Sequence, residues 1–502
     1  MSGIANRTLN GSDETTNLLP ESPKSPAKWD WKTITFLCIV LCITFDIGDY
    51  LIQAPRLRLY ESIICDEYYS THNISLPQTV PTGGPIPEQH CKLDEIQDEL
   101  AMIQGWQVAF DSISSILLAV PYGWVADKYG RKLVITAALG GCIMAYVWTL
   151  LVAGWWHLPL RWVWVSSIFL MIGGGNVTAT TMASTIVADV APLDMRSTAF
   201  LYRFTSDLVA ECLTPPIASM LMTKSVWIPL LAALGFELLG YAFIIPLPET
   251  LPQKTPEDTA ESSRSSEALV EEEEQRPLLE ADESDPKKPS RLSDMKESFS
   301  FLTRDKAVAA LVFTFLVSKV GRQSTNLIIQ YVSKRYHWSI AKAGLLLSLR
   351  AAVNIILFLL VLPAISTYAF PGATAAFKDL TISRVSILLM IFGTLVLSVS
   401  PTPALMIIGL VIYTLGTGFV PVVRSLITSL AESHHASKTS DVGRLYAIIG
   451  VMESIGSLLA GPGMAIAFRL GMKIGQAWLG LPFLVASALF GSVAGVVFWV
   501  KV

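Results

Sequence analysis

The sequence is poor in charged residues for its length. Only 16% of its 502 residues are Asp, Glu, Lys or Arg, whereas 52% are hydrophobic. A soluble domain carries about a quarter charged residues, so this deficit excludes an ordinary soluble protein. The net charge of −4 is small and gives no sign of a nucleic-acid partner.

The sequence also lacks the spacings that carry enzyme chemistry. The six His and six Cys residues follow no metal-ligand spacing, and no phosphate-binding glycine loop or nucleophile elbow is present. We interpret the pair His434-His435 as part of a solvated loop. We therefore expect no enzyme, no metal site and no cofactor.

Long apolar runs make up most of the chain. A membrane-spanning helix needs about 20 mainly apolar residues, and twelve runs of that kind follow one another. We expect spans near residues 34–54, 101–122, 132–153, 162–188, 197–222, 226–247, 306–328, 341–364, 383–400, 403–427, 443–467 and 474–500. The sequence thus predicts an all-α membrane protein with twelve transmembrane helices in two six-helix bundles.

Polar segments separate these runs into domains. Residues 1–33 and the acidic stretch 248–304 are expected to be disordered and cytoplasmic, because they contain too few apolar residues to fold. Residues 34–247 then form the N-terminal bundle and residues 305–502 the C-terminal bundle.

The loop between the first two spans carries two patterns of an extracytoplasmic segment. Asn73-Ile74-Ser75 is a glycosylation acceptor pattern. Cys65 and Cys91 share the same loop, where an oxidising compartment permits a disulfide. Spacing alone leaves open whether this pair forms.

A short charged turn joins the second and third spans. Residues 123–132 read Gly-Trp-Val-Ala-Asp-Lys-Tyr-Gly-Arg-Lys. Gly130 permits a positive φ in the turn, and Gly123 lets two helices approach closely. The basic residues indicate the cytoplasmic side, because short cytoplasmic loops collect Lys and Arg.

This turn resembles the loop between helices 2 and 3 of the major facilitator superfamily, which reads Gly-x-Leu-Ala-Asp-Arg-x-Gly-Arg-Lys. Val125 and Lys128 are the departures from it. The six spans on either side of a linker resemble the plan of the same superfamily, whose halves enclose a site near the middle of the membrane.

The resemblance implies a latch that holds one of two transport conformations. In it Arg131 would pair with Asp189, and Asp127 would meet the start of helix 11. The expected latch residues are Gly123, Asp127, Gly130, Arg131, Asp189, Arg196 and Arg444. The alternative is a static charge cluster that only anchors helices.

Charged residues inside the spans are the candidates for the transport site, since each costs about 2.5–3.5 kcal/mol at the bilayer centre. They are mostly acidic in the first half and mostly basic in the second. The expected substrate and proton pathway comprises Asp46, Asp49, Asp111, Arg203, Asp207, Glu211, Lys319, Arg322, Arg350 and Glu453, and Glu237 and Arg424 lie in the spans too. Carboxylates could carry protons, and the basic residues could hold an anionic or carbonyl-rich substrate. The alternative is that the two walls pair with each other and hold the halves in register.

Two further resemblances disagree on the direction of transport. Residues 214–219 and 460–463 are similar to the proline- and glycine-rich motif of exporters such as the drug:proton antiporters, although residues 168–171 lack the arginine usual in that branch. Cys65, Tyr68-Tyr69 and Cys91-Lys92 look like a fungal group related to the proton-coupled folate transporter, an importer.

We therefore expect a secondary active transporter of a small organic molecule that works by alternating access, as a monomer in the lipid bilayer. The main hypothesis is proton-coupled efflux of a secondary metabolite or xenobiotic across the plasma membrane. One alternative is proton-coupled uptake or vacuolar transport of an organic anion, since residues 14–19 and 274–279 look like acidic dileucine sorting signals. Another is a nutrient sensor that does not transport.

Overall fold

The computed structural model describes residues 30–72, 86–154, 158–192, 195–250, 306–365, 368, 374–434 and 439–500. The glycosylation pattern at Asn73, both dileucine patterns, His435, the N-terminal segment before residue 30 and linker residues 251–305 lie outside the described residues.

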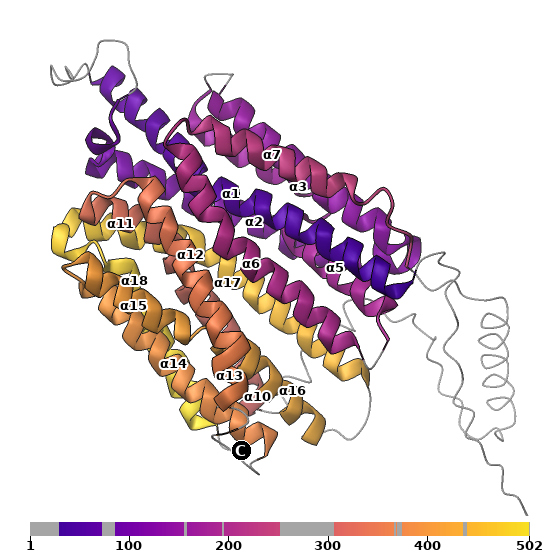
Figure 1. The fold of residues 1–502 in the computed structure, drawn as a ribbon. Helices are drawn as coiled ribbons and strands as arrows, with labels where there is room; N and C mark the ends of the chain where they lie inside the picture. Colours follow the sequence, from indigo (N-terminus) through magenta and orange to yellow (C-terminus); the bar gives the residue numbers. More distant parts are fainter. Residues whose placement is uncertain are drawn as a thin grey trace, which may run out of the picture.

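The first half of the chain folds into helices that lie side by side (Figure 1). The long ones are α1 (Trp31–Thr71), α2 (Asp94–Tyr129), α3 (Arg131–Gly154), α5 (Gly175–Val190), α6 (Arg196–Met222) and α7 (Trp227–Ala242). Three short helices connect them: η1 (Glu88–Cys91), η2 (Leu160–Val165) and α4 (Ser166–Phe169).

The second half forms another group of helices along the opposite side of the molecule (Figure 1). Its long helices are α10 (Lys306–Gln323), α12 (Ile340–Ile356), α14 (Ala375–Val399), α15 (Pro403–Leu415), α16 (Phe419–His434), α17 (Thr439–Ile474) and α18 (Leu481–Trp499). Shorter ones are η3 (Ser324–Leu327), α11 (Ile328–Tyr336), η4 (Leu357–Val361), α13 (Leu362–Ala364) and η6 (Gln476–Trp478).

Each predicted span coincides with one helix or with a series of consecutive helices, and the part of the chain that the structure describes contains no strand. Among the residues that the structure describes, seven helical segments are long and apolar enough to cross a membrane by length and hydropathy alone. An eighth is α2, whose two parts meet at an angle of 49°. The all-α membrane fold predicted from the sequence is therefore confirmed.

The first two helices are longer than predicted. The prediction ends the first span at residue 54, but α1 continues through Pro55 to Thr71. A proline inside a helix removes one backbone hydrogen bond, a loss that membrane helices tolerate. α2 begins at Asp94 instead of residue 101, so the loop between the two is shorter than expected.

The fourth predicted span is broken instead of continuous. α4 ends at Phe169 and α5 begins at Gly175, because Gly173 and Gly174 have φ values of +91° and +83°. A Cβ on Gly173 would lie 2.2 Å from the backbone nitrogen of Ala138 in α3. The glycines thus serve both a left-handed turn and a close helix contact.

The second half also differs from the prediction at several boundaries. Its first span is interrupted by η3, its second by the π-helical turn η4, and its fourth between Leu415 and Phe419. α14 begins at Ala375 instead of residue 383, and α18 begins at Leu481 because α17 extends to Ile474. Interrupted helices near the bilayer midplane are typical of transporter binding sites.

The two halves meet where α2 packs against α17 and α6 packs against α12. The α2–α17 contact is closest at Gly105 and Gly461, where a Cβ on Gly461 would lie 2.2 Å from the Gly105 carbonyl oxygen. Because neither position has room for a side chain, the two backbones touch directly. This contact closes one end of the space between the halves.

Candidate functional site

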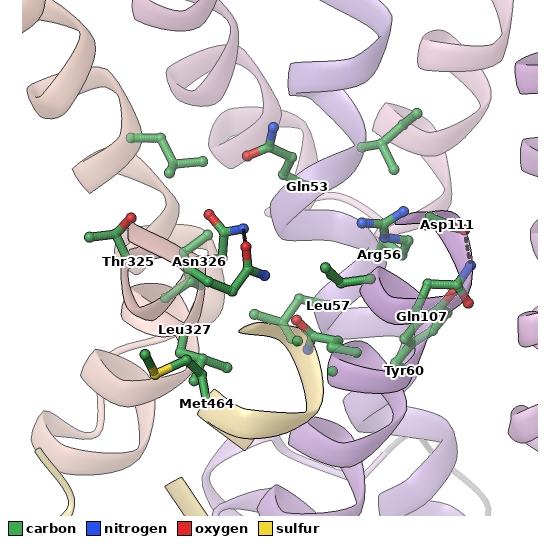
Figure 2. Close-up of a pocket in the computed structure, with 18 of the residues that line it drawn as sticks. Gln53, Arg56, Leu57, Tyr60, Gln107, Asp111, Thr325, Asn326, Leu327 and Met464 are labelled. Carbon is green, nitrogen blue, oxygen red and sulfur yellow. Dashed lines mark hydrogen bonds between the residues drawn. The ribbon is translucent and has the colours of Figure 1, made fainter. Parts of the chain in front are cut away.

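A polar cavity lies between the two halves and has three lobes, with volumes of about 280, 370 and 620 Å³. Gln323 at the end of α10 lines all three, so the lobes are connected. Figure 2 shows the smallest lobe, with Arg56 and Asp111 on one side and Thr325 and Asn326 on the other. The wall is therefore built by both halves.

The 370 Å³ lobe, here the acidic lobe, is lined mostly by the first half. Its charged residues are Asp49, Arg56, Asp111, Glu237 and Lys319. Asp111 accepts hydrogen bonds from Ser167 Oγ at 2.6 Å and from Gln107 Nε2 at 3.1 Å.

None of these five charged groups has an ion-pair partner within 4 Å among the described residues. Asp49 and Arg56 are exposed to the cavity. Glu237 is 4% exposed, and no hydrogen-bond partner of its Oε2 lies among the described residues. The acidic lobe thus holds charged groups that no counter-ion contacts directly.

The 620 Å³ lobe, here the basic lobe, is lined by Lys319, Arg322, Arg350 and Arg424 together with Glu211. Arg350 Nε of α12 donates to Glu211 Oε1 of α6 at 3.0 Å, a buried ion pair between the halves. Arg424 lies 3.1 Å from Glu453 Oε1, and Arg322 lies 4.0 Å from the same oxygen. No comparable partner within 4 Å is described for Lys319.

Four of the predicted pathway residues, Asp46, Arg203, Asp207 and Glu453, do not line these lobes. Asp46 pairs with Arg203 at 3.2 Å beside a small groove of the first half. Asp207 accepts a hydrogen bond of 3.0 Å from Tyr50. Of the ion pairs among the predicted pathway residues, only Arg350–Glu211 joins the two halves; the others lie within one half.

Arg56 is a cavity residue that the sequence prediction missed. It lies seven residues after Asp49, two helical turns further along the same face of α1. The prediction stopped the span at residue 54, one position before Pro55. Extending the helical period across the proline would have found it.

The turn at residues 123–132 brings together most of the predicted latch residues that the structure describes. Arg131 pairs with Asp127, and its Nε lies 3.4 Å from Asp189 Oδ2 of α5. Gly130 has φ of +113°, the positive value expected there. Arg196 begins α6, and its Nε is buried with no hydrogen-bond partner in the described part of the chain.

Other features of the turn differ from the expectation. A Cβ on Gly123 would meet nothing within 4 Å, so the expected close helix contact is absent in this conformation. The Arg444 side chain lies outside the description. Glu249, which the prediction assigned to the linker, accepts hydrogen bonds from the backbone N–H groups of Arg131 at 2.8 Å and Lys132 at 3.1 Å. A carboxylate there compensates the free N–H groups at the start of α3.

A second polar cluster lies at the opposite end of the molecule, which we call the disulfide end because Cys65 and Cys91 form a disulfide there. Its centre is Glu61 of α1, whose side chain is fully buried. Glu61 accepts hydrogen bonds from Lys92 Nζ at 2.6 Å, Gln97 Nε2 at 2.6 Å and Arg58 at 2.8 Å. The disulfide and these bonds attach η1 and the start of α2 to α1.

This cluster is bonded to the second half of the chain. Glu88 of η1 accepts a 2.7 Å hydrogen bond from the backbone N–H of Ile340. Lys334 of α11 lies 2.6 Å from Asp94, and Arg469 of α17 lies 3.1 Å from Asp98. We call these three contacts the outer clamp.

The described cavity is therefore closed at the disulfide end. There the outer clamp and the Gly105–Gly461 contact join the halves. The basic lobe extends away from the disulfide end, because Phe204 near the start of α6 and Phe358 beyond α12 line it. These residues lie toward the end that carries the 123–132 turn, the turn end.

Comparison with known proteins supports the same fold. The family model described as Major Facilitator Superfamily matches residues 93–461. Among solved structures, a D-xylose–proton symporter superposes with a TM-score of 0.60 at 12% identity, covering 93% of this chain and 97% of that one. Identity at this level supports the fold alone.

Fungal relatives are more similar in sequence. The chain is 37% identical to "MFS efflux pump atnC" of Emericella nidulans, over 97% of this chain and 93% of the relative. It is 30% identical to "Efflux pump ustT" of Aspergillus flavus, over 88% of this chain and 83% of the relative. Both names are those of transporters, which agrees with the transporter prediction and gives no support to the sensor alternative.

Proposed function

Starting from the fact that this chain belongs to the Major Facilitator Superfamily, we propose that it exports a small organic molecule across a membrane by alternating access. The observation that best supports this proposal is the 37% identity to a protein named as an efflux pump, over 97% of this chain. The cavity between the halves supplies the space that such a substrate needs.

In the proposed cycle the described conformation is the one that loads substrate. The cavity is closed by the outer clamp at the disulfide end and reaches toward the turn end, which we assign to the cytoplasm from its basic residues. Opening at the disulfide end requires the outer clamp to separate, and closing at the turn end brings the halves together there.

The latch belongs to the second conformation. We propose that Asp127 moves from Arg131 toward the start of α17 when the turn end closes. Arg131 remains paired with Asp189. Asp127 is free to do so, because its side chain is 69% exposed in the present state. A carboxylate is stabilised at a helix N-terminus, so this contact favours the state in which it forms.

Protons are the proposed coupling ion, and the cavity carboxylates are the proposed carriers. Among the described residues, Asp49 and Glu237 line the acidic lobe without a bonded cation, and the donors to Asp111 are the neutral Ser167 and Gln107. Protonation removes a charge that is expensive within the membrane. A proton can therefore exchange with substrate across the cycle.

We further place the protein in the plasma membrane as a monomer. Both walls of the cavity come from one chain, so a second copy is not needed to complete the site.

The experiment that tests export is metabolite profiling of the producing strain with and without the gene. Export predicts a compound that accumulates inside the deletion strain and falls in the medium, and re-expression restores it. Asp49→Asn at normal protein level should fail to restore it, and a protonophore should abolish release from the wild type. If the deletion raises the compound outside the cells, transport runs inward and the proposal fails.

A further inference from the structure

Five charged side chains in the cavity have no ion pair within 4 Å among the described residues. They are Asp49, Arg56, Asp111, Glu237 and Lys319. The other charged residues that line the cavity are already paired, as in Arg350–Glu211 and Arg424–Glu453. Since a charged side chain inside a membrane protein marks a functional site, these five are the groups available to a ligand.

The available charges differ in sign between the two lobes. Around the acidic lobe stand the carboxylates Asp49, Asp111 and Glu237, opposed by Arg56. Around the basic lobe stand Lys319 and three arginines, opposed by Glu211 and, behind the wall, Glu453. The cavity is therefore negative on one side and positive on the other.

Close helix packing fixes where the two opposite charges stand. A Cβ on Gly48 of α1 would lie 2.8 Å from Cγ of Glu237, so only glycine leaves room for that side chain. A Cβ on Gly456 of α17 would lie 3.0 Å from Cβ of Lys319. Lys319 lines both lobes and thus stands at their junction.

Neutral hydrogen-bonding groups lie between the lobes. Asn326 Nδ2 donates to Gln323 Oε1 at 3.0 Å, and both side chains line the cavity. Such amides can bond to carbonyl or amide groups in the middle of a ligand.

A ligand with a single sign of charge does not match this cavity. An anion in the basic lobe would extend toward three carboxylates, and a cation in the acidic lobe would extend toward Lys319. Like charges placed together cost several kcal/mol, which excludes both classes.

We propose that the cavity binds a zwitterionic molecule, with its ammonium group between Asp49 and Glu237 and its anionic group at Lys319. This rests on the proposed transport function and names the substrate class for it. Glu237 and Lys319 are then the residues that determine specificity.

The test uses the purified full-length protein in lipid nanodiscs and matched quartets of small probes. Each quartet contains a free dipeptide, its N-acetyl form, its C-terminal amide and its doubly blocked form, which are zwitterionic, anionic, cationic and neutral. Several dipeptides of different side chains are compared by the rise in melting temperature and by titrated Kd. The zwitterion should bind at least about tenfold more tightly than the other three forms, equivalent to one charge-assisted contact.

Variants assign each end of the ligand. Glu237→Gln should reduce binding of the zwitterion to that of the N-acetyl form and leave the N-acetyl form unchanged. Lys319→Gln should reduce binding of the zwitterion to that of the C-terminal amide and leave binding of the amide unchanged. Glu95→Gln and Lys224→Gln, both at exposed positions away from the cavity, are matched controls that should keep the wild-type ranking.

The inference is overturned if no quartet places the zwitterion first, or if Glu237→Gln and Lys319→Gln weaken all four forms alike. Its failure is separable from failure of the export proposal. An exported metabolite with one sign of charge would overturn the substrate class and leave export standing. A gene deletion that changes no metabolite would contradict the export proposal. The order of Kd values within the quartets in nanodiscs would still decide the ligand class.

Discussion

At the scale of single residues, the ion pair Arg350–Glu211 joins the halves at the level of the cavity. The Glu211 side chain is 7% exposed and the Arg350 side chain 22%. Breaking one partner of a buried pair leaves an uncompensated charge, which costs about 3–5 kcal/mol. Removing both partners avoids that cost.

We therefore predict a strongly non-additive double-mutant cycle. Glu211→Gln and Arg350→Gln should each lower stability by about 3 kcal/mol in denaturation of the protein in nanodiscs. The double variant should lose less than either single variant. Strict additivity of the two losses would contradict the pairing of these residues.

Gly130 permits a second prediction at this scale. Its φ of +113° is in a region that only glycine adopts freely, and a Cβ there would lie 2.2 Å from Glu249 Oε2. Gly130→Ala should cost about 1–3 kcal/mol and displace Glu249 from the start of α3, so thermal stability and transport should both fall. Gly491→Ala in α18, where a Cβ meets nothing within 4 Å, is the control and should keep both. An unchanged melting temperature in Gly130→Ala would refute the strained turn.

The sequence predicted those residues that a motif or a family resemblance identifies. The positive φ of Gly130 follows from its place in a ten-residue turn, and the Arg131–Asp189 contact, across 58 residues, was implied by the family that this turn resembles. Arg56 was missed because the predicted span ended at residue 54, and Glu249 because it was assigned to the linker. Tertiary packing decides which charged residues form ion pairs. The local sequence around each residue does not reveal that packing.

At the scale of helices, the period of apolar residues was enough to find the spans but not their interruptions. The breaks at Gly173 and η3 occur inside the predicted spans, at a glycine cluster and at the polar residues Gln323 to Asn326, whose effect on the helix the apolar period does not show. The extensions of α1 and α2 carry polar residues that a hydropathy window reads as loop. Their helical form depends on tertiary contacts such as those of buried Glu61.

The disulfide end provides a prediction about these elements. Cys65 and Cys91 close a loop with a sequence separation of 26, for which the chain-entropy model gives about 3 kcal/mol. In the double variant Cys65→Ser/Cys91→Ser, η1 should detach from α1. Hydrogen exchange should then rise at residues 86–93, and also at the start of α12, because Glu88 no longer holds the Ile340 N–H.

Cys212→Ser, which removes a free cysteine in α6, is the matched control and should leave exchange at both places unchanged. Faster exchange confined to residues 86–93 would show that η1 does not contribute to the outer clamp.

At the scale of the whole molecule, two groups of helices enclose one cavity that is closed at the disulfide end and extends toward the turn end. The outer clamp holds the disulfide end, and the 123–132 turn with its latch residues stands at the other. If the halves move as rigid bodies, loosening one end must close the other. The fold class was predictable from the sequence, whereas which end of the cavity is closed was not.

The central claim is tested most directly by measuring distances at both ends in the same protein. Spin labels at His72 and Ala477 report on the disulfide end, and labels at the exposed residues Ile245 and Tyr368 report on the turn end. Glu88→Gln with Lys334→Gln weakens the outer clamp by about 1 kcal/mol, or about fivefold in the ratio of states. Lys342→Gln, an exposed lysine of the same half, is the control. Alternating access predicts a longer disulfide-end distance together with a shorter turn-end distance. A longer disulfide-end distance with an unchanged turn-end distance would contradict it.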